Sequence, residues 1–119
     1  MSERSESKGA VPELLESVFT HDAFVEAVIS VVETIPPGRV MAYGEVAAAV
    51  GSRAARAVGR IMAHSGGELP WWRVVYADGH LLPGYEAQAL AQYAIEGTPL
   101  TPGGAAIDMR RARWSPGAP

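Results

Sequence analysis

Residues 43–64, YGEVAAAVGSRAARAVGRIMAH, contain two short helical patterns on either side of a glycine. In the first pattern, Val46, Ala47 and Val50 fall on one face of a helix. Gly51 follows at the position after a helix end, where φ is often positive and glycine is favoured. Two short helices joined by a tight turn that contains glycine are typical of a helix-turn-helix.

The second helix is expected from Arg53 to about His64, with the hydroxyl of Ser52 as its N-cap. Arg53, Arg56 and Arg60 follow one another at intervals of three and four residues, so they share the face opposite the alanine and valine side chains. A solvated arginine face and a DNA-binding face both fit this pattern, and the composition alone does not decide between them.

Patterns on both sides of this stretch complete a small α+β domain that is mainly helical. The segments expected are a helix over 20–35 that ends at Pro36-Pro37-Gly38, an extended segment 40–42, an extended segment 69–77, a hairpin turn at Asp78-Gly79 with Leu81-Leu82 as the returning strand, and a helix over 87–96 that ends at Gly97. A helix-turn-helix, a small hairpin and a C-terminal helix together predict a winged-helix-like DNA-binding domain.

The chain is expected to divide into three parts. Residues 1–19 are a polar N-terminal segment, residues 20–97 hold the winged-helix-like domain, and residues 98–119 are a tail rich in glycine and proline. Within the tail, residues 107–114 carry enough apolar side chains to dock on the domain. A chain of 119 residues is long enough to bury one core without disulfides or metals.

Composition excludes several classes of function. None of the 119 residues is a cysteine, which rules out a disulfide framework, a thiolate nucleophile and a cysteine-based metal site. His21, His64 and His80 lie far apart in sequence, so neither a metal nor a cofactor is expected. No apolar run is long enough to span a bilayer, and no secretory signal is recognisable, which predicts a cytoplasmic protein that does not contact membranes.

Charge is distributed unevenly along the chain. The net charge is −3, and residues 1–33 hold seven acidic side chains against two basic ones. Residues 34–73 hold five arginines against two glutamates, a local balance of +3. The net charge argues against a nucleic-acid binder, but the distribution of charge matters more, because the arginines of the basic centre present planar forks that suit phosphates and base edges. With so few basic residues, the affinity should be modest and strongly dependent on salt.

Two adjacent tryptophans stand in the segment Pro70-Trp71-Trp72-Arg73-Val74. In an extended strand their side chains would point to opposite faces, so at most one of them serves the main core. Two interpretations remain open: both rings are packing residues, or one of them is the wall of a pocket for a flat ligand such as a nucleobase.

Three motifs in this order resemble the DNA-binding domain of O6-alkylguanine-DNA alkyltransferases over residues 20–97. They are Ile35-Pro36-Pro37-Gly38-Arg39-Val40-Met41-Ala42-Tyr43-Gly44-Glu45-Val46-Ala47, then Ala55-Arg56-Ala57-Val58-Gly59-Arg60-Ile61-Met62, and then Pro70-Trp71-Trp72-Arg73-Val74-Val75 with Asp78-Gly79. In that family the third motif reads Pro-Cys-His-Arg-Val. Here Trp71 stands at the cysteine and Trp72 at the histidine, so the chain most resembles alkyltransferase-like proteins. Alkyl transfer needs a thiolate and indole is a poor nucleophile, so no enzymatic activity is expected.

The resemblance implies that a damaged guanine is rotated out of the duplex into a pocket. Arg56 matches the arginine that fills the gap left in the duplex, and Tyr43 matches the tyrosine that crowds the adjacent phosphate. Arg39, Arg53 and Arg60 are expected as further DNA-binding residues.

The lesion pocket is expected to have Trp71 as one wall. Trp72, Val74 and Tyr85 are its other expected members, and backbone carbonyls near Trp71 and Val74 would accept hydrogen bonds from the guanine edge. Glu96 matches the acidic residue of the family's active-site relay. With the cysteine and histidine replaced, we expect Glu96 to be structural and to pair with Arg73, which is also expected to be structural.

The function predicted is recognition of O6-alkylguanine in duplex DNA by a monomer that flips the nucleotide and directs it to nucleotide excision repair proteins of the UvrA type. Such a protein would be associated with the nucleoid in the cytoplasm. The main alternative is a winged-helix transcription regulator without lesion specificity, although residues 53–64 offer mainly alanine and arginine for base readout. Further alternatives are an enzyme with another nucleophile, such as Ser52 or Ser65, and an interaction module that has lost DNA binding.

Overall fold

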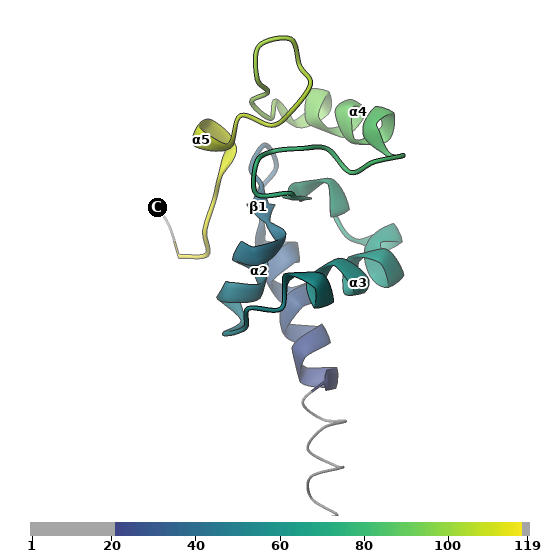
Figure 1. The fold of residues 1–119 in the computed structure, drawn as a ribbon, viewed down its shortest axis with the longest axis vertical. Coiled ribbons are helices and arrows are strands. Elements are labelled where there is room, and N and C mark those ends of the chain that lie inside the picture. The colour runs from purple at the N-terminus through teal and green to yellow at the C-terminus, as the bar shows by residue number, and fades with distance from the viewer. Residues whose placement is uncertain (1–20, 118–119) are drawn as a thin grey trace, which may run out of the picture.

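The computed structural model describes residues 21–117, which form a mainly helical α+β fold (Figure 1). Residues 21–34 are helical and are called the N-terminal helix below. The elements that follow are β1 (Met41–Ala42), α2 (Tyr43–Ala49), α3 (Ala55–Ser65), the 3₁₀ helices η1 (Gly66–Glu68) and η2 (Trp71–Arg73), β2 (Val74–Val75), α4 (Glu86–Glu96) and α5 (Met109–Ala112). The predicted fold class is confirmed. No helix within residues 21–117 is both long and apolar enough to cross a membrane.

The core consists of two clusters of buried side chains that meet at Trp71. The first cluster joins the N-terminal helix to α2 and α3 and includes Val28, Val32, Val46 and Val58. The second cluster joins β2 and the residue before β1 to α4 and the tail, and its buried members are Val40, Val75, Leu81, Ala89, Tyr93, Ile107 and Ala112. Trp71 packs against both clusters, so the aromatic segment lies at the junction of the two halves of the fold.

The predicted helix-turn-helix is present as α2 and α3, with one correction at the turn. Gly51 has a φ of 80°, as expected for a residue that ends a helix. However, α3 begins at Ala55, two residues later than predicted. The Ser52 hydroxyl accepts a hydrogen bond from the Ala54 N–H at 3.0 Å, so Ser52 stabilises the turn rather than capping the helix directly. Arg53 therefore lies before α3 and not on its arginine face.

The predicted hairpin is wrong, because β2 pairs with β1 in parallel, with Met41 opposite Val74 and Ala42 opposite Val75. The chain does turn at Asp78-Gly79, where the Gly79 N–H donates to the Tyr76 carbonyl at 2.9 Å. After the turn, the chain contacts the tail and does not return along β2. The Gly79 carbonyl accepts a hydrogen bond from the Ile107 N–H at 2.9 Å. The predicted strand 69–77 is also shorter than expected, because residues 71–73 form η2.

Helix α4 and the docked tail agree with the sequence predictions. Gly97 ends α4 with a φ of 71°. The tail lies beside β1, where the Val40 N–H donates to the Ala112 carbonyl at 3.0 Å and the Val40 carbonyl accepts from the Trp114 N–H at 2.9 Å. Ile107 and Ala112 are buried in the second core cluster. Figure 1 shows α4 and α5 together at the end of the fold away from the N-terminal helix.

We expect Gly79→Ala to lower the free energy of unfolding by at least about 2 kcal/mol, because two penalties add at this position. Gly79 has a φ of 85°, which L side chains rarely adopt, and a Cβ atom there would collide with the Ile107 carbonyl oxygen. Urea denaturation of both proteins measures the loss. Gly103→Ala is the matched control, since Gly103 has a φ of 92° but no atom within 4 Å of such a Cβ. An equal loss in both variants would contradict the role of the contact with Ile107.

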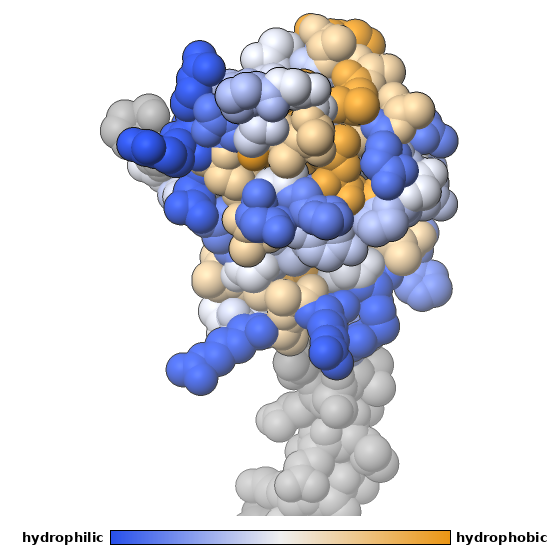
Figure 2. Space-filling view, turned by 45° about the horizontal axis from the view of Figure 1, so that its top comes forward, coloured by the Kyte–Doolittle hydropathy of each residue, from blue (hydrophilic) through white to orange (hydrophobic). Residues whose placement is uncertain are grey.

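Apolar side chains also reach the surface of the fold. Figure 2 shows a face on which apolar side chains gather between polar ones. The large hydrophobic residues that are exposed within the described chain are Tyr76, Tyr85 and Ile95. Two of these three are tyrosines, which combine an apolar ring with a polar hydroxyl and are therefore suited to binding interfaces that are partly hydrated.

Candidate nucleic-acid interface

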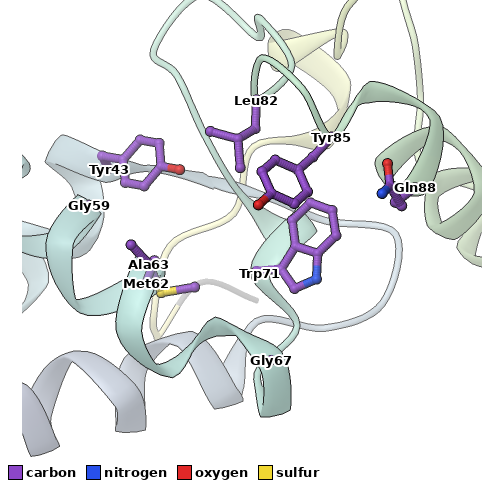
Figure 3. A pocket seen from close by; sticks show the side chains of 9 residues that line it. All are labelled: Tyr43, Gly59, Met62, Ala63, Gly67, Trp71, Leu82, Tyr85 and Gln88. Carbon is purple, nitrogen blue, oxygen red and sulfur yellow. The ribbon is translucent and has the colours of Figure 1, made fainter.

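A cavity of about 540 Å³ opens where α2, α3, η2 and the segment before α4 come together (Figure 3). Its lining residues are Tyr43, Gly59, Met62, Ala63, Gly67, Trp71, Leu82, Tyr85 and Gln88. None of these side chains carries a charge at neutral pH. Figure 3 shows the hydroxyls of Tyr43 and Tyr85 pointing toward the middle of the cavity. Its size and its mixture of aromatic and apolar walls are typical of a site for a small organic group.

Trp71 forms an aromatic wall of this cavity and lies between two other rings. Its ring centroid is 5.7 Å from that of Trp72, at an interplanar angle of 85°, and 5.9 Å from that of Tyr85, at 66°. Edge-to-face pairs at these separations are favourable beyond the area that they bury. Of the four residues that sequence analysis assigned to a lesion pocket, the structure brings Trp71 and Tyr85 to the cavity. Trp72 and Val74 are not among its lining residues.

Tyr43 lies at the start of α2 and is half-buried. The start of this helix is fixed by Glu45, whose Oε1 accepts from the Ala42 N–H at 2.8 Å. The Tyr43 ring packs against Tyr76 at a centroid distance of 5.5 Å. Burial, followed by the neighbouring Tyr76, raises the pKa of the Tyr43 hydroxyl. The hydroxyl is therefore neutral near pH 7 and can donate a hydrogen bond at the cavity.

The exposed face of α3 places Arg56 beside the cavity. Gly59 and Ala63 follow Arg56 at intervals of three and seven residues, so all three lie on one face of the helix. Gly59 and Ala63 line the cavity, and a Cβ atom at Gly59 would meet nothing within 4 Å. A strip of small residues thus leaves open surface next to the exposed Arg56 side chain.

Arg60 borders a different hollow on the other side of α3. This depression, of about 370 Å³, lies between α3 and the N-terminal helix and is also lined by His21 and His64. Arg56 and Arg60 are both exposed on α3, as predicted from their spacing, but Arg60 lines this depression and Arg56 does not. This separation was not predictable from helical periodicity alone.

Arg39 and Arg53 are placed differently from the arginines of α3. The Arg39 guanidinium donates to the carbonyls of Ala112 at 3.1 Å and Arg113 at 2.6 Å, so it holds the tail against β1. Arg53 is exposed in the turn before α3. The structure therefore leaves Arg53 available to an external partner, whereas Arg39 already has acceptors within the fold.

Glu96 lies behind the cavity and accepts four hydrogen bonds. Arg73 donates to both of its carboxylate oxygens, from Nε at 3.1 Å and from a terminal nitrogen at 2.6 Å. The Trp72 indole N–H donates at 2.9 Å and the Gly38 N–H at 3.1 Å. The Arg73 guanidinium also donates to the Ile35 carbonyl at 2.9 Å. The pairing expected between Glu96 and Arg73 is present, and it ties α4 to η2 and to the segment before β1.

The protonation of Glu96 follows from these contacts. Burial alone would raise the pKa of the carboxyl, but hydrogen bonds from Arg73, Gly38 and Trp72, together with the charge of Arg73, lower it below its ordinary value. The carboxylate is ionised near pH 7, and its two oxygens are shared among four donors. It is poorly placed to take a proton from a reacting group, because its lone pairs are already engaged.

Several lining residues were not predicted from the sequence, namely Gly59, Met62, Ala63, Gly67, Leu82 and Gln88. Gly59 did carry a signal, since glycine in a helix interior costs stability and usually marks a close approach or an open surface. Within residues 21–117, no three histidine, aspartate or glutamate side chains are grouped so that they could hold a metal ion. The cavity offers aromatic surface and hydroxyl groups, which are suited to binding a flat ligand.

Comparison with known proteins gives consistent matches over most of the chain. Residues 23–96 match the family model of the 6-O-methylguanine DNA methyltransferase DNA-binding domain. A DNA base-flipping protein of Escherichia coli (strain K12) is 38% identical over 104 residues, which cover 84% of this chain and 81% of that protein. A DNA base-flipping protein of Vibrio parahaemolyticus is 33% identical over 100 residues, which cover 80% of this chain and 99% of that protein.

Two crystal structures of a protein from S. pombe share the fold. One is Atl1 in complex with damaged DNA containing O6-carboxymethylguanine, and the other is ATL in complex with DNA. Each is 30% identical in sequence, covers 80% of this chain and 97% of its own, and superposes with a TM-score of 0.68.

Proposed function

The chain belongs to the family of the 6-O-methylguanine DNA methyltransferase DNA-binding domain, and from this we propose that it binds O6-alkylguanine in duplex DNA without repairing it. The observation that carries the proposal is the aromatic cavity walled by Trp71, the residue that stands at the family's cysteine. The base-flipping names of the bacterial relatives and the damaged-DNA complex of the S. pombe protein support the same function.

A flipped guanine would stack on Trp71 inside the cavity. Stacking of a base on an aromatic side chain contributes about 1–3 kcal/mol, which offsets part of the few kcal/mol needed to unstack and unpair a nucleotide. A base with a weakened Watson–Crick edge costs less to flip, so an alkylated guanine is favoured over an intact one. Tyr43 would crowd the adjacent phosphate, and Arg56 would enter the gap in the stack. Tyr43 lines the cavity, and Arg56 lies on the same face of α3 as the lining residues Gly59 and Ala63.

Alkyl transfer is not part of this function. No residue of the chain is a cysteine, and the indole of Trp71 is not a nucleophile near neutral pH. Glu96 is engaged by Arg73, Trp72 and Gly38 and cannot act as the base of a relay. The lesion would therefore remain on the DNA, flipped and marked by a bound protein.

A protein that marks a lesion without removing it needs a repair pathway downstream. We propose that the complex directs the lesion to nucleotide excision repair, through a damage sensor of the UvrA type. The bound protein and the distorted duplex are the physical signals available to such a partner. This role places the protein at the nucleoid in the cytoplasm, acting as a monomer, with residues 20–97 as the DNA-binding unit.

The test is a titration at fixed salt onto two labelled duplexes that differ only in one O6-methylguanine. We expect binding to the lesion duplex to be at least about tenfold tighter, since a difference of about 1.4 kcal/mol in flipping cost is sufficient. Digestion of the recovered DNA should return the methylated base unchanged. Equal affinity for both duplexes would favour a winged-helix regulator without lesion specificity, and loss of the methyl group would reveal a nucleophile.

A further inference from the structure

Trp72 is held by hydrogen bonds at both its side chain and its backbone. Its indole N–H donates to the Glu96 carboxylate at 2.9 Å, and its backbone carbonyl accepts from the buried Tyr93 hydroxyl at 2.6 Å. The Arg73 guanidinium carbon lies 5.6 Å from the centroid of its ring, within the range of a cation–π contact. Both the backbone and the side chain of Trp72 are thus fixed by neighbours that are themselves hydrogen-bonded.

Besides the side chains of the two core clusters, Trp71 has two aromatic neighbours, one held by hydrogen bonds and one exposed. Trp72, which does not line the cavity, packs against its ring at an interplanar angle of 85°, whereas Tyr85, which does line the cavity, is 52% exposed. Side chains this exposed move readily among rotamers, so Tyr85 restrains Trp71 only weakly. Of the two aromatic rings that restrain the Trp71 indole beyond its core packing, Trp72 is therefore the stronger restraint.

We infer that Trp72 is a positioning residue, which fixes the Trp71 ring as a preformed wall of the cavity. Glu96 holds the Trp72 indole by a hydrogen bond, and Trp72 in turn restrains the Trp71 ring. Trp72 does not line the cavity and does not touch the bound base. Its contribution is preorganisation, because a wall that is already fixed loses no rotamer freedom when the base enters. This inference rests on the proposed function, since it concerns how the same cavity selects a flipped base.

The geometry also explains how tryptophan can occupy this position. An indole N–H donates to a carboxylate and, unlike an imidazole, does not gain a proton between pH 5 and 8. The Glu96 carboxylate, which accepts this hydrogen bond, has a lowered pKa and stays ionised over the same range. The wall is therefore held by contacts that do not titrate near neutral pH.

Trp72→Phe is the variant that tests the inference, because it keeps an aromatic ring beside Trp71 and removes the donor to Glu96. We expect affinity for the O6-methylguanine duplex to fall about threefold to tenfold, the range given by freeing one side chain, while affinity for the plain duplex stays the same. Trp114→Phe is the matched control. Trp114 packs on the first core cluster and does not line the cavity, so the same chemical change there should leave both affinities unaltered.

Fluorine NMR of protein labelled with fluorotryptophan supplies a readout that does not depend on DNA. The Trp71 resonance should shift or split in Trp72→Phe, as the ring samples more than one rotamer, and should stay unchanged in Trp114→Phe. An unchanged Trp71 resonance, or equal losses of affinity for both duplexes, would overturn the positioning role. If the wild-type protein shows no preference for the lesion, the proposed function fails, and the resonance still decides whether Trp72 orients Trp71.

Discussion

Arg56→Ala is expected to lower affinity for a duplex with one O6-methylguanine about fivefold to 150-fold, the loss that corresponds to about 1–3 kcal/mol of stacking. The reason lies in its position on α3, where the exposed guanidinium stands beside the cavity wall formed by Gly59 and Ala63. From there it can occupy the space that a flipped guanine leaves between its neighbours. A planar guanidinium stacks on bases, which a lysine ammonium does not. Titration of both labelled duplexes at one salt concentration measures the effect.

The comparison that makes this result specific is Arg60→Ala, one turn further along the same helix. Arg60 carries the same charge but borders the separate depression beside the N-terminal helix. Its loss should weaken binding to both duplexes equally and reduce the salt dependence by about one phosphate contact. If Arg56→Ala also weakened both duplexes equally, Arg56 would be an ordinary phosphate contact and the gap-filling role would be wrong. Because the Arg56 side chain is exposed, the fold should be unaffected.

Local sequence signals predicted the helices well and the strand pairing poorly. Gly51 and Gly97 each end a helix with a positive φ, as expected from the conformational freedom of glycine. The pairing of β1 with β2 joins segments more than thirty residues apart, and nothing in residues 69–82 alone reveals it. The Asp78-Gly79 turn is present, but the Gly79 carbonyl accepts a hydrogen bond from the Ile107 N–H in the tail and not from an adjacent strand. A turn signal specifies a reversal of direction and does not specify what the chain meets afterwards.

The sequence predicted the site residues that belong to recognisable motifs, and it did not predict those that only contribute to the shape of the cavity. Trp71, Tyr43 and Arg56 were singled out from motifs, and the structure brings Trp71 and Tyr43 to one cavity with Arg56 beside it. Met62 and Gln88 lack such a signal, since each has an ordinary residue type for its helix. Their place in the cavity depends on how α3 and α4 are oriented by the two core clusters. Tertiary packing decides that orientation, which helical periodicity does not encode.

Trp72 shows why neighbouring residues in a motif can have separate roles. A strand would have sent Trp71 and Trp72 to opposite faces, whereas the family resemblance assigned both residues to the lesion pocket. Instead η2 turns the two rings against each other at an interplanar angle of 85°. One ring faces the cavity and the other reaches Glu96. The sequence identified the pair as unusual, but only the backbone conformation distinguishes the ring that lines the cavity from the ring behind it.

Glu96→Gln should cost about 3–5 kcal/mol of unfolding free energy at pH 7, the largest effect on stability that we expect. The side chains of Arg73 and Glu96 are only 15% and 8% exposed, so the variant would leave a buried guanidinium without its countercharge. A loss of this size is a large fraction of the stability of a small domain. Urea denaturation measures it. The control is Glu45→Gln at the exposed pair with Arg113, where the loss should stay below about 1 kcal/mol.

The pH dependence of the unfolding free energy provides a second test of the Glu96→Gln variant. The folded-state pKa of Glu96 is lowered, so its stabilisation is complete above the unfolded-state pKa of about 4.3 and is lost as the pH falls through the folded value. The difference in unfolding free energy between wild type and Glu96→Gln should therefore be constant from pH 7 to about pH 5 and shrink below about pH 4. A difference that stayed constant into strong acid would mean that Gln disrupts packing rather than charge pairing. In that case the contacts of residue 96 would stabilise the fold through packing and not through charge, and Arg73 would tolerate a neutral partner.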